Sequence, residues 1–154
     1  MELLDDNQMR TINMVKATNR TWSEKPTLFI KFSGTKAAVR EAIDIVGKIA
    51  KNNNGGKFEF ANSEKEKYDL WSARKEALFS VLSLREKEGE VWTTDGISLA
   101  LCGVWGQWLM VVAVPISKLP DLIERSKIAF DKSGLHTTIV SHALDGNFRM
   151  SLIK

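Results

Sequence analysis

The chain of 154 residues is poor in the residues that build disulfide and metal frameworks. It has one cysteine, Cys102, and two histidines, His136 and His142. A single thiol cannot form an internal disulfide, and no cysteine spacing typical of a zinc site occurs. The composition therefore excludes a disulfide-stabilised fold and fits a reducing compartment.

The chain also lacks a strong excess of charge of one sign. It has 22 basic and 19 acidic residues, a net charge of +3. Both signs alternate within stretches such as Glu64–Asp69 and Arg85–Glu90. Nucleic-acid-binding domains usually gather basic residues on one face, so we expect no nucleic-acid partner and interpret the charges as solvated helix faces.

Targeting and membrane-spanning signals are also missing. Met1–Arg10 contains three acidic residues and no long apolar stretch, so it is neither a secretory signal nor an arginine-rich presequence. Gly96–Ser117 has no charged residue and approaches the ~20 residues of a membrane span. Its ends carry no interfacial basic cluster, so we expect no span.

What is present is ordinary for one globular domain with a proper core: 44% hydrophobic and 27% charged residues. Apolar spacing predicts helices over 3–18, Thr35–Lys51, a stretch following Ser63, and Lys118–Asp131. Alternation predicts strands over Thr27–Phe32, Lys57–Ala61, Val91–Thr94, Leu135–Val140 and Phe148–Ile153. This order predicts an α+β fold, an antiparallel sheet with helices packed on one face.

Two local motifs support these boundaries. Ser63 and Glu66 fit a capping box, in which each side chain satisfies a backbone N–H at the start of a helix. Asp145-Gly146-Asn147 predicts a tight turn between the last two strands, with Gly146 at positive φ.

Several stretches, in this order and spacing, resemble the C-terminal domain of FAD-linked oxidases, in particular the fungal D-lactate dehydrogenase (cytochrome) branch. They are Glu2–Asp5, Gln8–Arg10, Pro26–Gly34, Leu70–Leu78, Trp92–Asp95, Val112–Pro120, Ser133–Leu135 and Asp145–Phe148. Proteins of this family are two-domain flavoenzymes, in which a C-terminal cap domain closes over the flavin of an N-terminal domain. The family oxidises D-lactate to pyruvate and passes electrons to cytochrome c, usually in mitochondria.

The resemblance implies that residues 1–154 form a partial cap domain, because nothing in the chain resembles the N-terminal FAD-binding domain. We expect such a fragment to be inactive alone, since the substrate's hydride needs a flavin acceptor. The alternative is a non-catalytic small binding protein, or a membrane-associated one that uses the apolar segment 96–117.

Arg74 is the candidate substrate-binding residue. Trp71 and Arg74 match a Trp-x-x-Arg pattern of the family, whose arginine holds the substrate carboxylate. A guanidinium suits this role because it donates two parallel hydrogen bonds to a carboxylate. Spacing alone favours a different interpretation, an arginine on a helix surface that forms salt bridges; the resemblance favours the substrate-binding role.

His142 is the candidate metal ligand. The family pattern Gly-His-x-Gly-Asp-Gly-Asn-x-His supplies two histidines to a divalent metal such as zinc. Here Ser141 and Leu144 replace glycines and Arg149 replaces the second histidine, and arginine has no lone pair to offer a metal. His142 is thus at most a partial site; otherwise it is a turn histidine with no ligand role.

By resemblance, Asp145, Gly146 and Asn147 lie near the flavin. The turn alone carries little functional information, because Asp-Gly-Asn occurs in many loops. His136 has no motif around it, and we interpret it as structural.

Residues 96–111 are an insertion relative to the family, whose pattern runs from Thr-Thr-Asp directly into Val-Ala-Val-Pro. The insertion includes Cys102, Trp105 and Trp108. We interpret it as translated intron sequence, since the genetic code permits in-frame removal that joins Asp95 to Val112. An uncharged insert of this kind predicts poor solubility.

Overall fold

The computed structural model describes residues 1–86, 89–93 and 112–153. In chain order the elements are β1 (Glu2–Leu4), α1 (Asp6–Met14), β2 (Thr27–Phe29), α2 (Lys36–Asn52), α3 (Glu64–Ser83), β3 (Val91–Thr93), β4 (Val112–Ala113), a 3-10 turn (Ile116–Lys118), α5 (Leu119–Asp131), β5 (His136–His142) and β6 (Asn147–Ile153).

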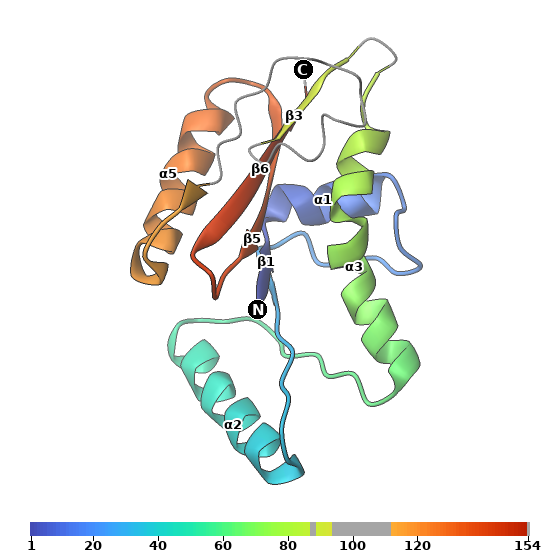
Figure 1. Cartoon of the computed structure of the whole chain (residues 1–154). Helices are drawn as coiled ribbons and strands as arrows, with labels where there is room; N and C mark the ends of the chain where they lie inside the picture. The colour runs from blue at the N-terminus through green and yellow to red at the C-terminus, as the bar shows by residue number, and fades with distance from the viewer. Residues whose placement is uncertain (87–88, 94–111, 154) are drawn as a thin grey trace.

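These strands form one antiparallel sheet in the order β2-β1-β5-β6-β3, and β4 also pairs with β6 (Figure 1). The β5–β6 hairpin is its centre, paired along seven residues from His136↔Ile153 to His142↔Asn147. β1, although near the N-terminus, pairs with the end of β5. The first and last parts of the chain therefore meet at the middle of the sheet.

Helices α1 and α3 pack on one face of this sheet. Leu4 of β1, Met9 and Ile12 of α1, and Ala73 and Ala77 of α3 are buried in one cluster. The small side chains of the two alanines let α3 lie close to α1. Val140 of β5 packs against this cluster, which forms the core on the α1 and α3 side of the sheet.

Helix α5 packs on the opposite face (Figure 1). Successive strand residues point to opposite faces, so Ile139 of β5 and its partner Met150 of β6 turn away from Val140. Both pack in a second cluster with Leu119 and, more peripherally, Leu122 of α5. The predicted α+β class and antiparallel sheet are confirmed, and helices lie on both faces of the sheet.

The first predicted helix, 3–18, is shorter than its apolar spacing indicated. Glu2–Leu4 is a strand, and Asp5 caps the helix that follows. The carboxylate of Asp5 accepts hydrogen bonds from the backbone N–H of Gln8 at 2.8 Å and of Ile139 at 3.1 Å. One buried side chain thus ends the strand, starts α1 and ties both to β5.

Two predicted strands also differ from the structure. β2 ends at Phe29 rather than Phe32, because its partner β1 is only three residues long. Lys57–Ala61 is not a strand, since no described strand pairs with it. Phe58 and Phe60 instead stack on each other, with ring centroids 5.7 Å apart.

The predicted helix starting after Ser63 is confirmed as α3, with a modified cap. Ser63 accepts a hydrogen bond from the backbone N–H of Glu66 at 3.2 Å. The Glu66 carboxylate reaches back to the backbone N–H of Asn62 at 2.7 Å, one residue earlier than in a standard capping box.

Strands β3 and β4 pair with the same edge of β6, the edge opposite to β5. Thr93 lies opposite Ser151, and Val112 lies opposite Phe148. Arg149 and Met150 therefore separate the two partners on β6. The proposed insertion, 96–111, lies outside the described residues.

Candidate functional site

The two candidate site residues Arg74 and His142 meet at the carboxylate of Glu2. The Nε of Arg74 donates a hydrogen bond to Oε2 of Glu2 at 2.9 Å, and Nδ1 of His142 lies 2.8 Å from Oε1. The side chains of Glu2 and Arg74 are 16% and 23% exposed, and that of His142 is 41% exposed. The group therefore sits at the border between core and solvent.

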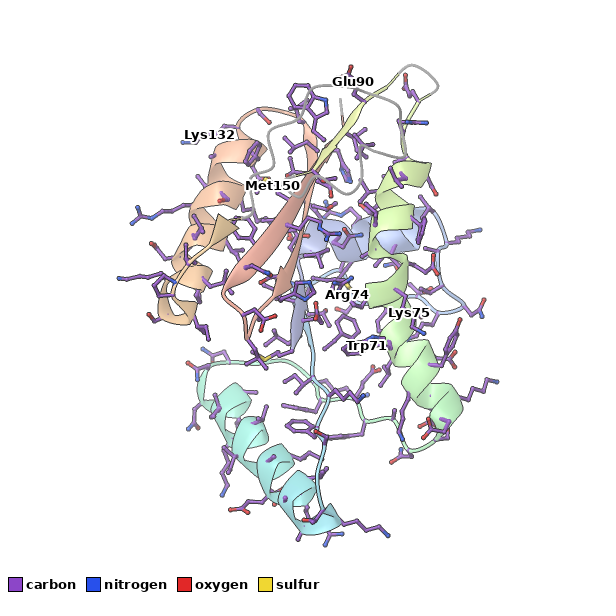
Figure 2. All side chains as sticks on the ribbon, in the orientation of Figure 1. Trp71, Arg74, Lys75, Glu90, Lys132 and Met150 are labelled. Atoms are coloured by element: carbon purple, nitrogen blue, oxygen red, sulfur yellow. The ribbon has the colours of Figure 1, made fainter. Side chains whose placement is uncertain are left out.

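Helix α3 directs Arg74 toward the sheet (Figure 2). Ala73 and Ala77 on the same side of the helix are buried against α1 and β1. Trp71, one turn earlier, contacts Phe29 of β2 edge-on, with ring centroids 6.2 Å apart. This packing fixes the rotation of α3 about its axis, so the backbone of Arg74 is held in a fixed position relative to the sheet.

The sheet supplies the other side of the site as a row of residues on neighbouring strands. Phe29, Glu2, His142 and Asn147 are consecutive cross-strand partners on β2, β1, β5 and β6. Cross-strand partners lie on the same face, so the side chains of Glu2, His142 and Asn147 face the α3 side. Arg149, two residues after Asn147 on β6, lies on the same face opposite Val140.

The charge of Glu2 is maintained by its partners. Burial raises the pKa of this carboxyl, but hydrogen bonds and positive charge from Arg74 and His142 outweigh burial and leave the pKa below its usual value. Glu2 is thus a carboxylate at neutral pH. In this structure the carboxylate that Arg74 binds is that of Glu2.

The turn Asp145–Asn147 connects β5 to β6 as predicted, and Gly146 has φ of 71°. The carbonyl of Gly146 accepts a hydrogen bond from the N–H of Val114 at 2.9 Å, and a Cβ at Gly146 would lie 2.1 Å from the Val114 carbonyl oxygen. Gly146 is therefore required by packing within this chain. Nothing in the turn's geometry selects a flavin, so the flavin contact of Asp145, Gly146 and Asn147 stays a prediction.

The described residues do not fit a divalent metal at His142. Glu2 and His142 provide a carboxylate and an imidazole, but a zinc site needs at least three protein ligands. Across 1–86, 89–93 and 112–153, no group of three or more His, Cys, Asp or Glu side chains could hold a metal ion. The Arg74 guanidinium also bonds to the same carboxylate, and a cation repels a metal there.

Sequence reasoning did not identify Glu2 or Asp5 as important residues. Both lie in the stretch Glu2–Asp5 that carries the family resemblance, and their three-residue spacing gave no sign that one faces Arg74 and the other caps α1. The available signal was weak: two acidic residues flank the apolar pair Leu3 and Leu4 at a predicted element boundary.

His136 lies apart from the site. Its Nε2 is 2.8 Å from Oγ1 of Thr11, whose hydroxyl also donates to the carbonyl of Asn7. Burial lowers the pKa of His136, and the positive charge of Arg10 lowers it further. These contacts are those of a structural histidine between α1 and β5.

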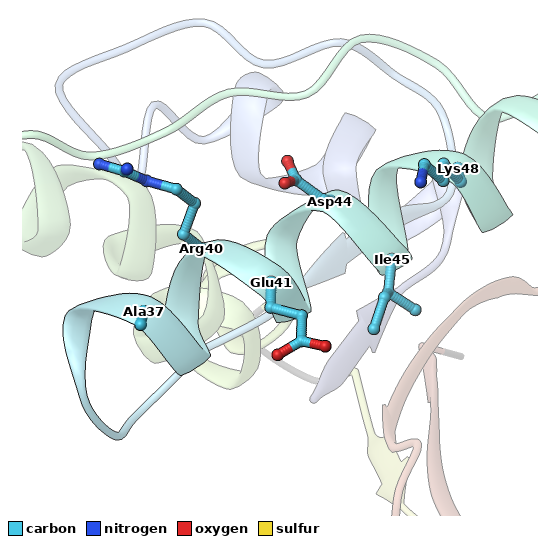
Figure 3. Close-up of a pocket in the computed structure, with 6 residues that line it drawn as sticks. All are labelled: Ala37, Arg40, Glu41, Asp44, Ile45 and Lys48. Atoms are coloured by element: carbon cyan, nitrogen blue, oxygen red, sulfur yellow. The ribbon is translucent and has the colours of Figure 1, made fainter.

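Helix α2 presents a separate surface depression, lined by Ala37, Arg40, Glu41, Asp44, Ile45 and Lys48 (Figure 3). All six side chains come from one helix, and no residue of α2 is buried. This is the outer surface of a helix rather than an enclosed site.

In the part of the chain that the structure describes, no helix has both the length and the apolar character to cross a membrane.

In this antiparallel α+β domain, a helix with a Trp-x-x-Arg pattern faces a histidine on the sheet. The sequence matches the family described as FAD linked oxidases, C-terminal domain, over residues 1–99 and 104–153. The chain belongs to this family. The break between the matched ranges, 100–103, falls within the segment 96–111.

Curated proteins to which the chain is similar include three D-lactate dehydrogenases. It is 44% identical to "D-lactate dehydrogenase [cytochrome], mitochondrial" of Kluyveromyces lactis, over 99% of this chain and 25% of that protein. It is 40% identical to the Arabidopsis thaliana protein of the same name and 39% identical to "D-lactate dehydrogenase [cytochrome] 1, mitochondrial" of Saccharomyces cerevisiae, each over 99% of this chain and 24% of the relative. The chain thus spans about a quarter of the length of these relatives.

Proposed function

We propose that this chain is the substrate-binding cap portion of a mitochondrial flavoenzyme that oxidises D-lactate to pyruvate and passes electrons to cytochrome c. Family membership and the names of the relatives support the reaction class. The single observation that carries the site is the half-buried Arg74, which holds a carboxylate at the sheet surface. In this proposal, Arg74 binds the carboxylate of a small D-2-hydroxy acid.

FAD would accept the hydride from the substrate carbon, and the chain's own residues would hold the acid in position. Arg74 would supply two N–H donors in a fixed plane, which set the direction of the carboxylate. His142 and Asn147, on the same face of the sheet, would border the rest of the substrate. We propose that the isolated chain does not turn over D-lactate, because residues 1–99 and 104–153 match the C-terminal domain of FAD linked oxidases and the reaction needs a flavin acceptor.

Ligand binding and flavin content test this proposal separately. A titration of the chain with D-lactate, followed by NMR, should show saturable shifts that Arg74→Ala abolishes. Arg74→Lys keeps the charge but loses the paired donors, so it should weaken binding roughly tenfold or more. Equal binding by wild type and Arg74→Ala would refute the role of Arg74. Flavin absorbance in the purified chain would refute the assignment of the flavin site to another part of the enzyme.

The uncharged run Gly96–Ser117 favours a second candidate function, a non-catalytic protein that associates with membranes through this segment. The two candidates differ in how the chain partitions. Extraction that requires detergent, together with no response to D-lactate, would support the second candidate over the first.

A further inference from the structure

Glu2 is held in place more firmly than an ordinary surface counterion. Each of its carboxylate oxygens has its own partner, Oε2 with Arg74 and Oε1 with His142. Its backbone lies in β1, which pairs with β2 on one side and with β5 on the other. A residue fixed at both ends can orient its neighbours, whereas a flexible surface acid cannot.

The contact with Glu2 also determines which edge of Arg74 is left for a ligand. A guanidinium presents five N–H donors in a rigid plane, and a carboxylate takes two of them side by side. Among the described residues, Arg74 hydrogen-bonds through Nε alone. The edge formed by its two terminal nitrogens is therefore the edge that can receive a second carboxylate end-on.

Two effects of Glu2 on a bound acid oppose each other. Its negative charge repels a substrate carboxylate, but Arg74 and His142 offset that charge directly. The second effect is entropic. Ordering the long Arg74 side chain on ligand binding costs conformational entropy, and this cost does not weaken binding if Glu2 already holds the side chain in place. The repulsion predicts tighter binding without Glu2, and the ordering predicts weaker binding.

We propose that Glu2 is the positioning residue of this site: it fixes Arg74 through Nε and directs the terminal nitrogens of Arg74 toward the substrate carboxylate. The inference rests on the proposed carboxylate-binding role of Arg74 and extends it to the residue that orients the guanidinium. Glu2 itself does not contact the substrate. The anchored geometry favours one-sided, end-on capture of small acids that carry a carboxylate at one end.

The test combines ligand affinity with the 15N resonance of the Arg74 Nε–H in the 154-residue chain. Glu2→Ala removes the acceptor, whereas Glu2→Gln keeps an acceptor oxygen and removes the charge. Asp121→Ala is the matched control, because it removes an exposed carboxylate that pairs with Arg125 at 3.0 Å on α5, on the other face of the sheet. D-Lactate is the probe, and D-lactamide, which lacks the carboxylate, controls for specificity.

We expect Glu2→Ala to shift the Arg74 Nε–H resonance and to weaken D-lactate binding about tenfold, as when a long side chain is ordered only on binding. Glu2→Gln should stay within about twofold of wild type, because its amide oxygen accepts the same hydrogen bond. Asp121→Ala should change neither measurement. If Glu2→Ala unfolds by circular dichroism, Glu2→Leu, which is closer in volume to Glu, replaces it.

Equal or tighter binding by Glu2→Ala would overturn the inference and make Glu2 a competitor for Arg74. An unchanged Arg74 Nε–H resonance in Glu2→Ala would also overturn the inference, whatever the measured affinity for D-lactate. If wild type does not respond to D-lactate but Glu2→Ala moves the resonance and Glu2→Gln does not, the positioning contact stands and the proposed function fails.

Discussion

At the scale of single residues, backbone geometry can determine which residue type a position accepts, just as side-chain chemistry does at other positions. Gly146 has positive φ and touches the backbone of Val114, so both its conformation and the space around it require glycine. Gly47, inside α2, has open space around it and an ordinary helical backbone. The two glycines allow a matched comparison.

Gly146→Ala should destabilise the chain by about 2 kcal/mol or more, because it adds strain at positive φ and a clash with the Val114 carbonyl. Gly47→Ala should instead stabilise it by roughly 0.5–1 kcal/mol, since alanine is the better helix former. Urea unfolding measures both changes. A neutral Gly146→Ala variant would contradict the tight contact between the turn and Val114.

His136 should make the stability of the chain depend on pH. Because burial and Arg10 lower its folded-state pKa below the ordinary value of 6.5, the folded state favours neutral imidazole. The stabilising contribution is therefore complete above about pH 6.5 and is lost as the pH falls through the lower, folded-state pKa. The pKa of Glu2 is also lowered, so its contribution is lost only in a more acidic range, below 4.5.

We expect the melting temperature of wild type to fall between pH 7.5 and pH 5.5 and that of His136→Gln to fall less. Glutamine can still bond to Thr11 but does not titrate. Thermal melts in matched ionic strength measure this. Parallel pH profiles for the two proteins would show that His136 does not carry the effect.

At the scale of elements, α1 and α3 are linked by the buried side chain of Gln8. Its amide donates hydrogen bonds to the carbonyl of Ala77 at 3.0 Å and to the hydroxyl of Ser80 at 2.9 Å. These bonds join segments about 70 positions apart in the sequence and keep α3 in the rotation that directs Arg74 to the sheet. A polar residue in the core thus fixes how two helices pack.

Gln8→Ala should destabilise the chain by about 2 kcal/mol, because it removes two hydrogen bonds and leaves a cavity between the helices. Lys65→Ala, at an exposed position on α3, should stay within about 0.5 kcal/mol of wild type. Chemical denaturation measures both. A loss for Gln8→Ala no larger than for Lys65→Ala would mean that the two helices pack without help from Gln8.

Local sequence signals predicted α2, α3 and α5 well, because the signals that define them are contiguous. Thr35 and Ser63 cap their helices, and the apolar spacing that follows them is regular. The strand at Glu2–Leu4 was not predictable in this way, because its partners β2 and β5 are remote in sequence. The same limit applies to the site: resemblance identified Arg74 and His142, but only the sheet register revealed that Glu2 joins them.

At the scale of the whole molecule, the registers of β3 and β4 on β6 support the interpretation of 96–111 as an insertion. Thr94 and Asp95 are the two residues between β3 and that segment, and Arg149 and Met150 are the two residues of β6 between the partners of β3 and β4. A chain that joins Asp95 directly to Val112 would therefore pair continuously with β6 from Ala113↔Asn147 to Val91↔Ile153.

Deletion of residues 96–111 should raise the soluble yield and the melting temperature, because one continuous edge strand replaces two short pieces. Replacement of the segment by a Gly/Ser linker of equal length is the control; it removes the apolar side chains of the segment but keeps its length. Solubility should improve in both variants and the melting temperature only in the deletion. No gain in soluble yield on deletion would contradict the prediction.

The position of β5 and β6 in the sequence also matters for the order in which a growing chain can fold. β6 pairs with β5, β3 and β4, and β5 pairs with β1, so most of the sheet depends on residues 136–153. A ribosome makes these residues after α1 and α3, whose buried apolar side chains pack against the sheet. The β5–β6 hairpin is local and can form quickly once made, so completion of the hairpin sets the moment at which the sheet closes.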